Sequence, residues 1–158
     1  AVVSGFFGSV GLWRNHRVTK AMERKAAAAL DRVEAAPLAG RLMSEMSSGE
    51  ARRILLGRAM IHDPEALVLD EPATSLDLRA AREFRETIRR LARRGTSLIL
   101  VTHDLEDVIP EISRVILLRD GRVFRDGPKK TVLTSENLSS LYRMPVRLET
   151  ARGSFTAR

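Results

Sequence analysis

The sequence predicts an α/β fold in which short buried strands alternate with amphipathic helices. Two apolar runs, at residues 66–69 and 97–101, have the length and continuity typical of buried parallel strands. A segment with helical periodicity, residues 78–94, separates them. A strand, helix, strand order predicts a right-handed crossover, which brings the carboxyl ends of both strands to one edge of the sheet.

Composition restricts the kind of protein this is. The 158 residues are 44% hydrophobic and 30% charged, which suits a globular domain with a packed core. The absence of cysteine excludes thiol chemistry, and the net charge of +7 permits an anionic partner without indicating one. The longest apolar stretch, residues 1–13, is interrupted by glycine and is too short to span a bilayer, so we expect no membrane span.

Two helices are predicted before the first strand. Residues 15–36 are mostly helix formers and end at Pro37, which predicts one amphipathic helix. Ser47 and Glu50 have the spacing of a capping box, so a second helix is expected to begin at Ser47 or Ser48. Its buried face is predicted to hold Ala51, Ile54, Leu55 and Ala59.

The third helix, residues 78–94, has an apolar face and a clear end. We predict a Glu86–Arg90 ion pair on its outer face and a glycine stop at Gly95. The inward residues are expected to be Ala81, Phe84, Ile88 and Leu91. Beyond the second strand, the sequence predicts a short helix at 105–112 and an antiparallel hairpin of 115–118 with 123–125. The residues after the hairpin are expected to form short helices and a tail.

Polar residues follow both predicted strands. Asp70 and Glu71 end the first strand and His103 follows the second, so we expect His103 to lie near Glu71. A strand-end carboxylate at Asp70 suits Mg²⁺, which takes one or two protein carboxylates and keeps several waters. Glu71 could then orient or deprotonate a water, with His103 bonding to that water and to a phosphate. Taken alone, Asp70-Glu71-Pro72 is better interpreted as a simple polar turn.

Four short motifs occur in one order along the chain. They are Met46-Ser47-Ser48-Gly49-Glu50, Leu67-Val68-Leu69-Asp70-Glu71-Pro72, Ser75-Leu76-Asp77 and Thr102-His103-Asp104. Together they resemble the signature, Walker B, D-loop and switch-histidine motifs of ABC-type ATPases. The resemblance implies a P-loop NTPase-like ABC ATPase core, incomplete, with part of the helical signature lobe.

The resemblance also implies cofactors and residue roles. The cofactors are ATP and Mg²⁺, with Asp70 as the metal ligand and Glu71 and His103 as catalytic residues. The residues implied to contact nucleotide, on the ATP held by a second subunit, are Ser47, Ser48, Gly49, Glu50 and Asp77. A helix start with unpaired amides and a positive dipole can bind an anion, although a Ser-x-x-Glu pattern alone is more often only a capping box.

The phosphate-binding loop of the family is missing from these 158 residues. No Gly-x-x-x-x-Gly-Lys-[Ser/Thr] occurs, so we expect a C-terminal portion of a longer ATPase, inactive by itself. The expected division is a helical lobe with the signature motif at 1–62, an ATPase core portion at 63–127, and C-terminal helices and a tail at 128–158.

The resemblance implies partners as well. They are a second ATPase subunit, most simply a homodimer, and an integral membrane permease, at the cytoplasmic face of the membrane. Residues 1–13 and 133–146 resemble the metal or metal-chelate importer branch, and the first stretch also resembles molybdate-related ATPases. The alternatives are a soluble ABC-type ATPase acting on DNA or ribosomes, and a noncatalytic remnant; we expect no nucleic-acid partner because basic and acidic residues alternate on the arginine-rich helix.

Overall fold

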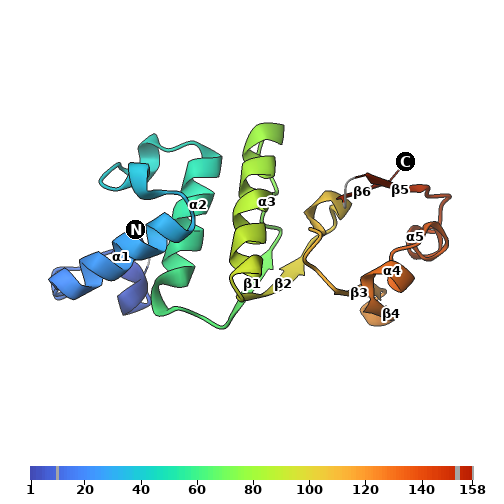
Figure 1. Ribbon diagram of the computed structural model, residues 1–158, viewed down its shortest axis with the longest axis horizontal. Coiled ribbons are helices and arrows are strands. Elements are labelled where there is room, and N and C mark those ends of the chain that lie inside the picture. Colours follow the sequence, from blue (N-terminus) through green and yellow to red (C-terminus); the bar gives the residue numbers. More distant parts are fainter. Residues whose placement is uncertain (10, 152–153, 158) are drawn as a thin grey trace. The chain divides into compact units, whose positions relative to one another are not determined.

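The computed structural model describes residues 1–9, 11–151 and 154–157, which form two compact units, residues 1–101 and 102–158. The helices and strands of the first unit are η1 (Val2–Phe7), α1 (Lys20–Arg32), η2 (Ala36–Leu38), η3 (Met43–Glu45), α2 (Ser48–Ala59), η4 (Met60–His62), β1 (Ala66–Asp70), α3 (Leu78–Arg93) and β2 (Ser97–Val101) (Figure 1). Those of the second unit are η5 (Leu105–Asp107), β3 (Arg114–Arg119), β4 (Arg122–Pro128), α4 (Lys129–Val132), α5 (Ser135–Tyr142), β5 (Leu148–Ala151) and β6 (Ser154–Ala157).

The predicted strand, helix, strand unit is confirmed. β1 and β2 pair in parallel, with Ala66 opposite Ser97 and Asp70 opposite Val101. The α3 helix lies beside them in Figure 1, and its four predicted inward residues are all buried. Gly95, with φ 95°, follows the helix and supports the predicted stop. On the other face of the sheet Val68, Ile99 and Val101 are exposed, at 67%, 54% and 50%.

The helices before β1 differ in detail from the prediction. α1 begins at Lys20, later than predicted, because the Thr19 side chain accepts a hydrogen bond from Met22 N and caps it there. The α1 helix ends at Arg32, before Glu34, whose φ of 54° is not helical. In α2 the predicted burial of Ile54 is confirmed, but the prediction is wrong for Leu55 and Ala59. Both are exposed, Leu55 at 44%, and Leu56 is buried instead.

In α3 the predicted Glu86–Arg90 pair is also wrong. Arg90 instead pairs with Glu34, which follows α1, and donates to the Thr87 hydroxyl at 3.0 Å. Glu86 pairs with Arg89 at 3.0 Å and Arg93 at 3.8 Å. Arg90 therefore connects the end of α1 to α3, which intrahelical spacing alone does not reveal.

The second unit contains the predicted hairpin and a further one. β3 and β4 are antiparallel, and Asp120 and Gly121 both have positive φ, as a tight hairpin turn of the primed type requires. The predicted helix at 105–112 is only the 3₁₀ turn η5, and β5 and β6 form an antiparallel hairpin where only short helices and a tail were expected. The buried core of this unit is formed by Leu117, Val132, Leu133, Leu138 and Phe155.

Candidate ATP hydrolysis site

Asp70 and Glu71 lie where the predicted sheet edge requires them. Asp70 is the last residue of β1 and is exposed. Glu71 N donates to Val101 O at 2.8 Å, which continues the contact between the two strands by one residue. The backbone of Glu71 then has φ 45°, a left-handed conformation that is costly for a residue with a side chain and occurs preferentially at functional sites. The strand therefore ends in a fixed turn at Glu71.

The turn after Glu71 holds its carboxylate. The Thr74 hydroxyl donates to Glu71 Oε2 at 3.1 Å, and Thr74 N donates to Glu71 O at 3.2 Å. Glu71 is half-buried, with an acceptor group held beside the exposed Asp70. Two adjacent carboxylates in different surroundings can take different roles, one binding a cation and the other accepting a proton.

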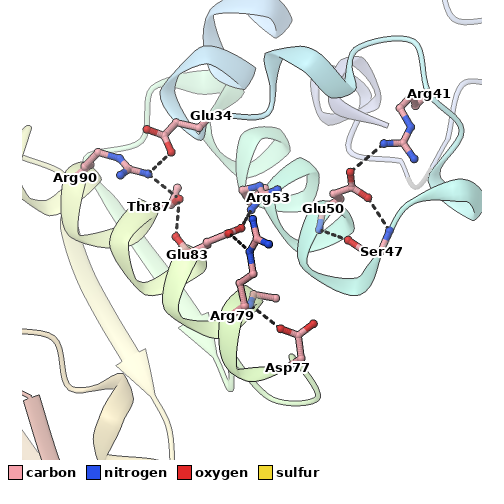
Figure 2. A network of polar contacts seen from close by, with 11 residues as sticks. Glu34, Arg41, Ser47, Glu50, Arg53, Asp77, Arg79, Glu83, Thr87 and Arg90 are labelled. Atoms are coloured by element: carbon pink, nitrogen blue, oxygen red, sulfur yellow. Dashed lines mark hydrogen bonds and ion pairs between the residues drawn. The ribbon is translucent and has the colours of Figure 1, made fainter.

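Asp77 caps the helix that follows this turn. Its Oδ1 accepts from Ala80 N at 2.8 Å at the start of α3 (Figure 2). Ser75 has φ 66°, so the segment between Glu71 and Asp77 contains a second left-handed residue. The Walker B motif thus runs from β1 into the turn that also contains the D-loop motif, between β1 and α3.

The signature residues form a complete capping box at the start of α2. Ser47 Oγ accepts from Glu50 N at 3.3 Å, and Glu50 Oε2 accepts from Ser47 N at 2.8 Å. Arg41 pairs with Glu50 Oε1 at 2.9 Å, as Figure 2 shows. The backbone N–H of Ser47 and its side chain hold the pKa of Glu50 below its ordinary value of 4.5, and Arg41 adds to that effect. The capping box leaves the first-turn amides of Ser48 and Gly49 as the donors able to meet an anion.

Gly49 has a packing role that the motif alone did not reveal. The residue is buried, and an ideal Cβ built on it would lie 2.8 Å from the Cβ of Ala80 in α3. The starts of α2 and α3 therefore lie against each other, and any larger residue at this position would separate them. Gly49 and Ala80 are far apart in the sequence, so the sequence alone does not predict this contact.

Two arginines of α2 that sequence analysis missed connect it to the turn and to α3. Arg52 Nη2 donates to Thr74 O at 3.4 Å, next to the Glu71 carboxylate. Arg53 pairs with Glu83 at 3.1 Å, and Glu83 also accepts from Arg79 at 2.9 Å (Figure 2). Arg79 and then Arg53 lower the pKa of Glu83, so this carboxylate stays charged as the link between the helices.

His103 belongs to the second unit and is exposed. It lies two residues after the end of β2, and its approach to Glu71 stays a prediction. Of the other two histidines, His16 is half-buried and stacked on Phe7 with ring centroids 4.1 Å apart, whereas His62 is exposed with an edge contact to Phe6.

The residues present fit a magnesium ion bound mainly by phosphates and water. Within residues 1–9, 11–151 and 154–157, no cluster of three or more His, Asp or Glu side chains could hold a metal by itself. Asp70 offers one exposed carboxylate at a strand end, which is the kind and number of protein ligand that Mg²⁺ takes beside a nucleotide.

No helix in the same described residues is long and apolar enough to cross a membrane.

Comparison with known proteins finds similar sequences over most of this chain. A family model described as "AAA domain, putative AbiEii toxin, Type IV TA system" matches residues 32–106. The chain is 35% identical to the uncharacterized ABC transporter ATP-binding protein YlmA of Bacillus subtilis, covering 92% of this chain and 55% of YlmA. It is 38% identical to the hemin import ATP-binding protein HmuV of Streptomyces coelicolor, covering 80% of this chain and 45% of HmuV.

Comparison with solved structures also finds an ABC transporter. The structure described as "An inward-facing conformation of a putative metal-chelate type ABC transporter" matches with TM-score 0.83 and 25% identity, covering 99% of this chain and 62% of that chain. The similar sequences also include a molybdenum import ATP-binding protein and an Fe(3+) ions import ATP-binding protein. These descriptions agree with the resemblance to metal-related importers. The chain spans about half the length of the curated relatives it matches. Its homologues are thus the ATP-binding proteins of ABC transporters, and its fold is part of the ABC ATPase cassette.

Proposed function

We propose that this chain is the part of an ABC importer's ATP-binding subunit that carries the hydrolytic acids and the signature motif. The observation that supports it best is the arrangement at the end of β1. There, Asp70 is exposed, and Glu71 is held in a left-handed turn by Val101 and Thr74. The homologous ABC ATP-binding proteins and the cassette fold support the same proposal.

In the proposed reaction each residue has one task. Asp70 would hold the magnesium ion that accompanies ATP, and that ion would supply positive charge to neutralise the phosphates. Glu71 accepts a proton from the attacking water, and the hydrogen bond from the Thr74 hydroxyl to its carboxylate supports this role. His103 donates a hydrogen bond toward the γ-phosphate. The functional division that we propose is the helical signature lobe at 1–62, the core portion at 63–127 and the C-terminal part at 128–158.

The signature residues serve a second subunit in this proposal. Ser47, Ser48, Gly49 and Glu50 present the start of α2, whose unpaired first-turn amides and dipole attract a phosphate. Asp77 would lie at the same interface. The proposal therefore includes a dimer of cassettes, in which each signature motif meets the ATP held by the other.

An apolar groove in the first unit is the proposed docking surface for a membrane permease. It has a volume of about 500 Å³ and lies between η1, α1 and the segment 38–46. Leu42 and Met43 line it and are 63% and 36% exposed. An amphipathic helix from a permease on the cytoplasmic side of the membrane suits a groove of this kind.

ATP hydrolysis tests the proposed function. We define the completed cassette as this chain preceded by a Walker A-bearing segment, from the reading frame upstream of Ala1 or, where that frame has none, from YlmA. The purified 158-residue chain is expected to bind MgATP weakly without turnover, and the completed cassette to hydrolyse it. Stoichiometric hydrolysis by the chain alone, or none by a folded completed cassette, would contradict the proposal.

The alternative functions give different results. Co-purification with a co-expressed integral membrane permease supports the importer. DNA binding that weakens steeply with salt would instead support a soluble ATPase acting on nucleic acid. Binding of a second cassette without hydrolysis would support a noncatalytic remnant.

A further inference from the structure

A buried carboxylate lies four residues after the exposed His103 in sequence, and the proposed mechanism does not use it. Asp107 is only 2% exposed, although a carboxylate is costly to bury unless hydrogen bonds compensate it. Its Oδ2 accepts a hydrogen bond from the Thr102 hydroxyl at 3.0 Å. A hydrogen bond to an ionised acceptor is among the stronger ones in proteins, so this contact compensates part of the cost.

The Thr102 hydroxyl makes two hydrogen bonds that connect the residues on either side of His103. While it donates to Asp107, it accepts from Asp104 N at 3.0 Å. Asp107 N donates to Asp104 O at 3.1 Å, and Asp104 Oδ1 accepts from Glu106 N at 2.9 Å. The residues on both sides of His103 are thus connected to each other, which fixes the backbone that carries the imidazole.

The loop that carries His103 is attached to the core of its unit. Leu105 and Val108 pack against the buried cluster that contains Leu138 and Phe155. Ile109 N donates to Asp107 O at 2.8 Å, and Ile109 is itself buried. The contacts run from the apolar core through Asp107 and Thr102 to His103.

We propose that Asp107 is a positioning residue, which holds the His103 loop in place through the Thr102 hydroxyl. Asp107 acts on backbone geometry and need not touch ATP. The inference about the loop stands on these hydrogen bonds, whereas its effect on turnover rests on the proposed function of His103.

The loop is tested first in the 158-residue chain. Thr102→Val keeps the side-chain volume and removes the hydroxyl, whereas Thr102→Ser retains it. We expect T102V to speed amide hydrogen exchange at Asp104 about tenfold and to broaden the NMR signal of the His103 ring. T102S is expected to retain the wild-type protection. The matched control is Thr131→Val, which removes a threonine hydroxyl bonded to Pro128 O elsewhere in the unit.

Turnover is tested second, in the completed cassette. We expect T102V to lower kcat about tenfold with KM for ATP within about twofold, and to cause no further loss in a His103→Ala background. Asp107→Asn, which keeps an acceptor oxygen, is expected to fall between wild type and T102V.

Two results would overturn the positioning role. One is unchanged Asp104 exchange in T102V, and the other is an equal loss of kcat with and without His103. If His103→Ala leaves turnover intact, the assigned role of His103 fails, while Asp104 exchange, measured in Asp107→Asn as well as in T102V, still decides whether Asp107 orders the loop through Thr102.

Discussion

Glu50 shows how one residue serves both the fold and the proposed site. Its carboxylate accepts from Ser47 N and pairs with Arg41, and these contacts lower its pKa from 4.5. A group whose pKa is lowered on folding stabilises the protein above its unfolded pKa, and that contribution disappears as the pH falls through its folded pKa. Glu50 therefore contributes to stability at neutral pH and not in strong acid.

The variant Glu50→Gln isolates this charge. Glutamine can still accept from Ser47 N in a capping box, but it loses the charge that Arg41 and the helix start attract. We expect E50Q to be less stable than wild type at pH 7, with a difference that shrinks as the pH is lowered to about 3, measured by urea unfolding. A stability difference that is the same at both pH values would show that the charge is irrelevant.

Gly49 gives a second prediction at this scale. Because a Cβ here would lie 2.8 Å from Ala80 Cβ, we expect Gly49→Ala to destabilise the chain by about 1–2 kcal/mol despite alanine's better helix propensity. Adding Ala80→Gly should restore part of that loss. Gly11→Ala serves as the control, since nothing lies within 4 Å of a Cβ at Gly11. An unchanged unfolding midpoint in G49A would contradict the packing of α2 on α3.

At the scale of elements, the contact between α2 and α3 includes the Arg53–Glu83 pair. Arg53 has a largely covered side chain, 18% exposed, whereas Glu83 is 44% exposed. We expect a double-mutant cycle of Arg53→Gln and Glu83→Gln to be non-additive in free energy of unfolding, with a small favourable coupling. As the control, the effects of R53Q and E86Q on the free energy of unfolding should be additive. A coupling of zero between R53Q and E83Q would show that this ion pair does not stabilise the contact between α2 and α3.

The elements also show what local sequence can predict. The capping box at Ser47, the apolar face of α3 and the Asp120-Gly121 turn were predictable, because each depends on residues close in sequence. The burial of Leu56 instead of Leu55 and the pairing of Arg90 with Glu34 were not. Both depend on which neighbouring element packs against the helix, and periodicity gives no information on that.

Some features of the candidate site were likewise predictable from the sequence, and others were not. Asp70 and Glu71 at a strand end followed from the apolar run before them. The left-handed backbone of Glu71, its bond from Thr74 and the contact of Gly49 with Ala80 required coordinates. Turn residues other than glycine in that conformation, and contacts between distant helices, have no reliable sequence signal.

At the scale of the whole molecule, the chain consists of two units with separate cores. Leu138 is fully buried in the second unit, so we expect Leu138→Ala to destabilise that unit by about 2–4 kcal/mol. Hydrogen exchange should rise across 102–158 and stay unchanged in 1–101. Leu56→Ala, in the first unit, should give the reverse pattern. An equal rise in both halves for either variant would mean that the units unfold together.

The central claim is that Glu71 activates the water that attacks ATP. The most direct measurement is steady-state ATP hydrolysis by the completed cassette carrying Glu71→Gln, with Glu65→Gln as a control of equal charge change just before β1. We predict that E71Q lowers kcat by about 100-fold or more while MgATP binding is retained, because an amide cannot accept the proton. E65Q should hydrolyse ATP at the wild-type rate. Hydrolysis by E71Q within about twofold of wild type would contradict the account.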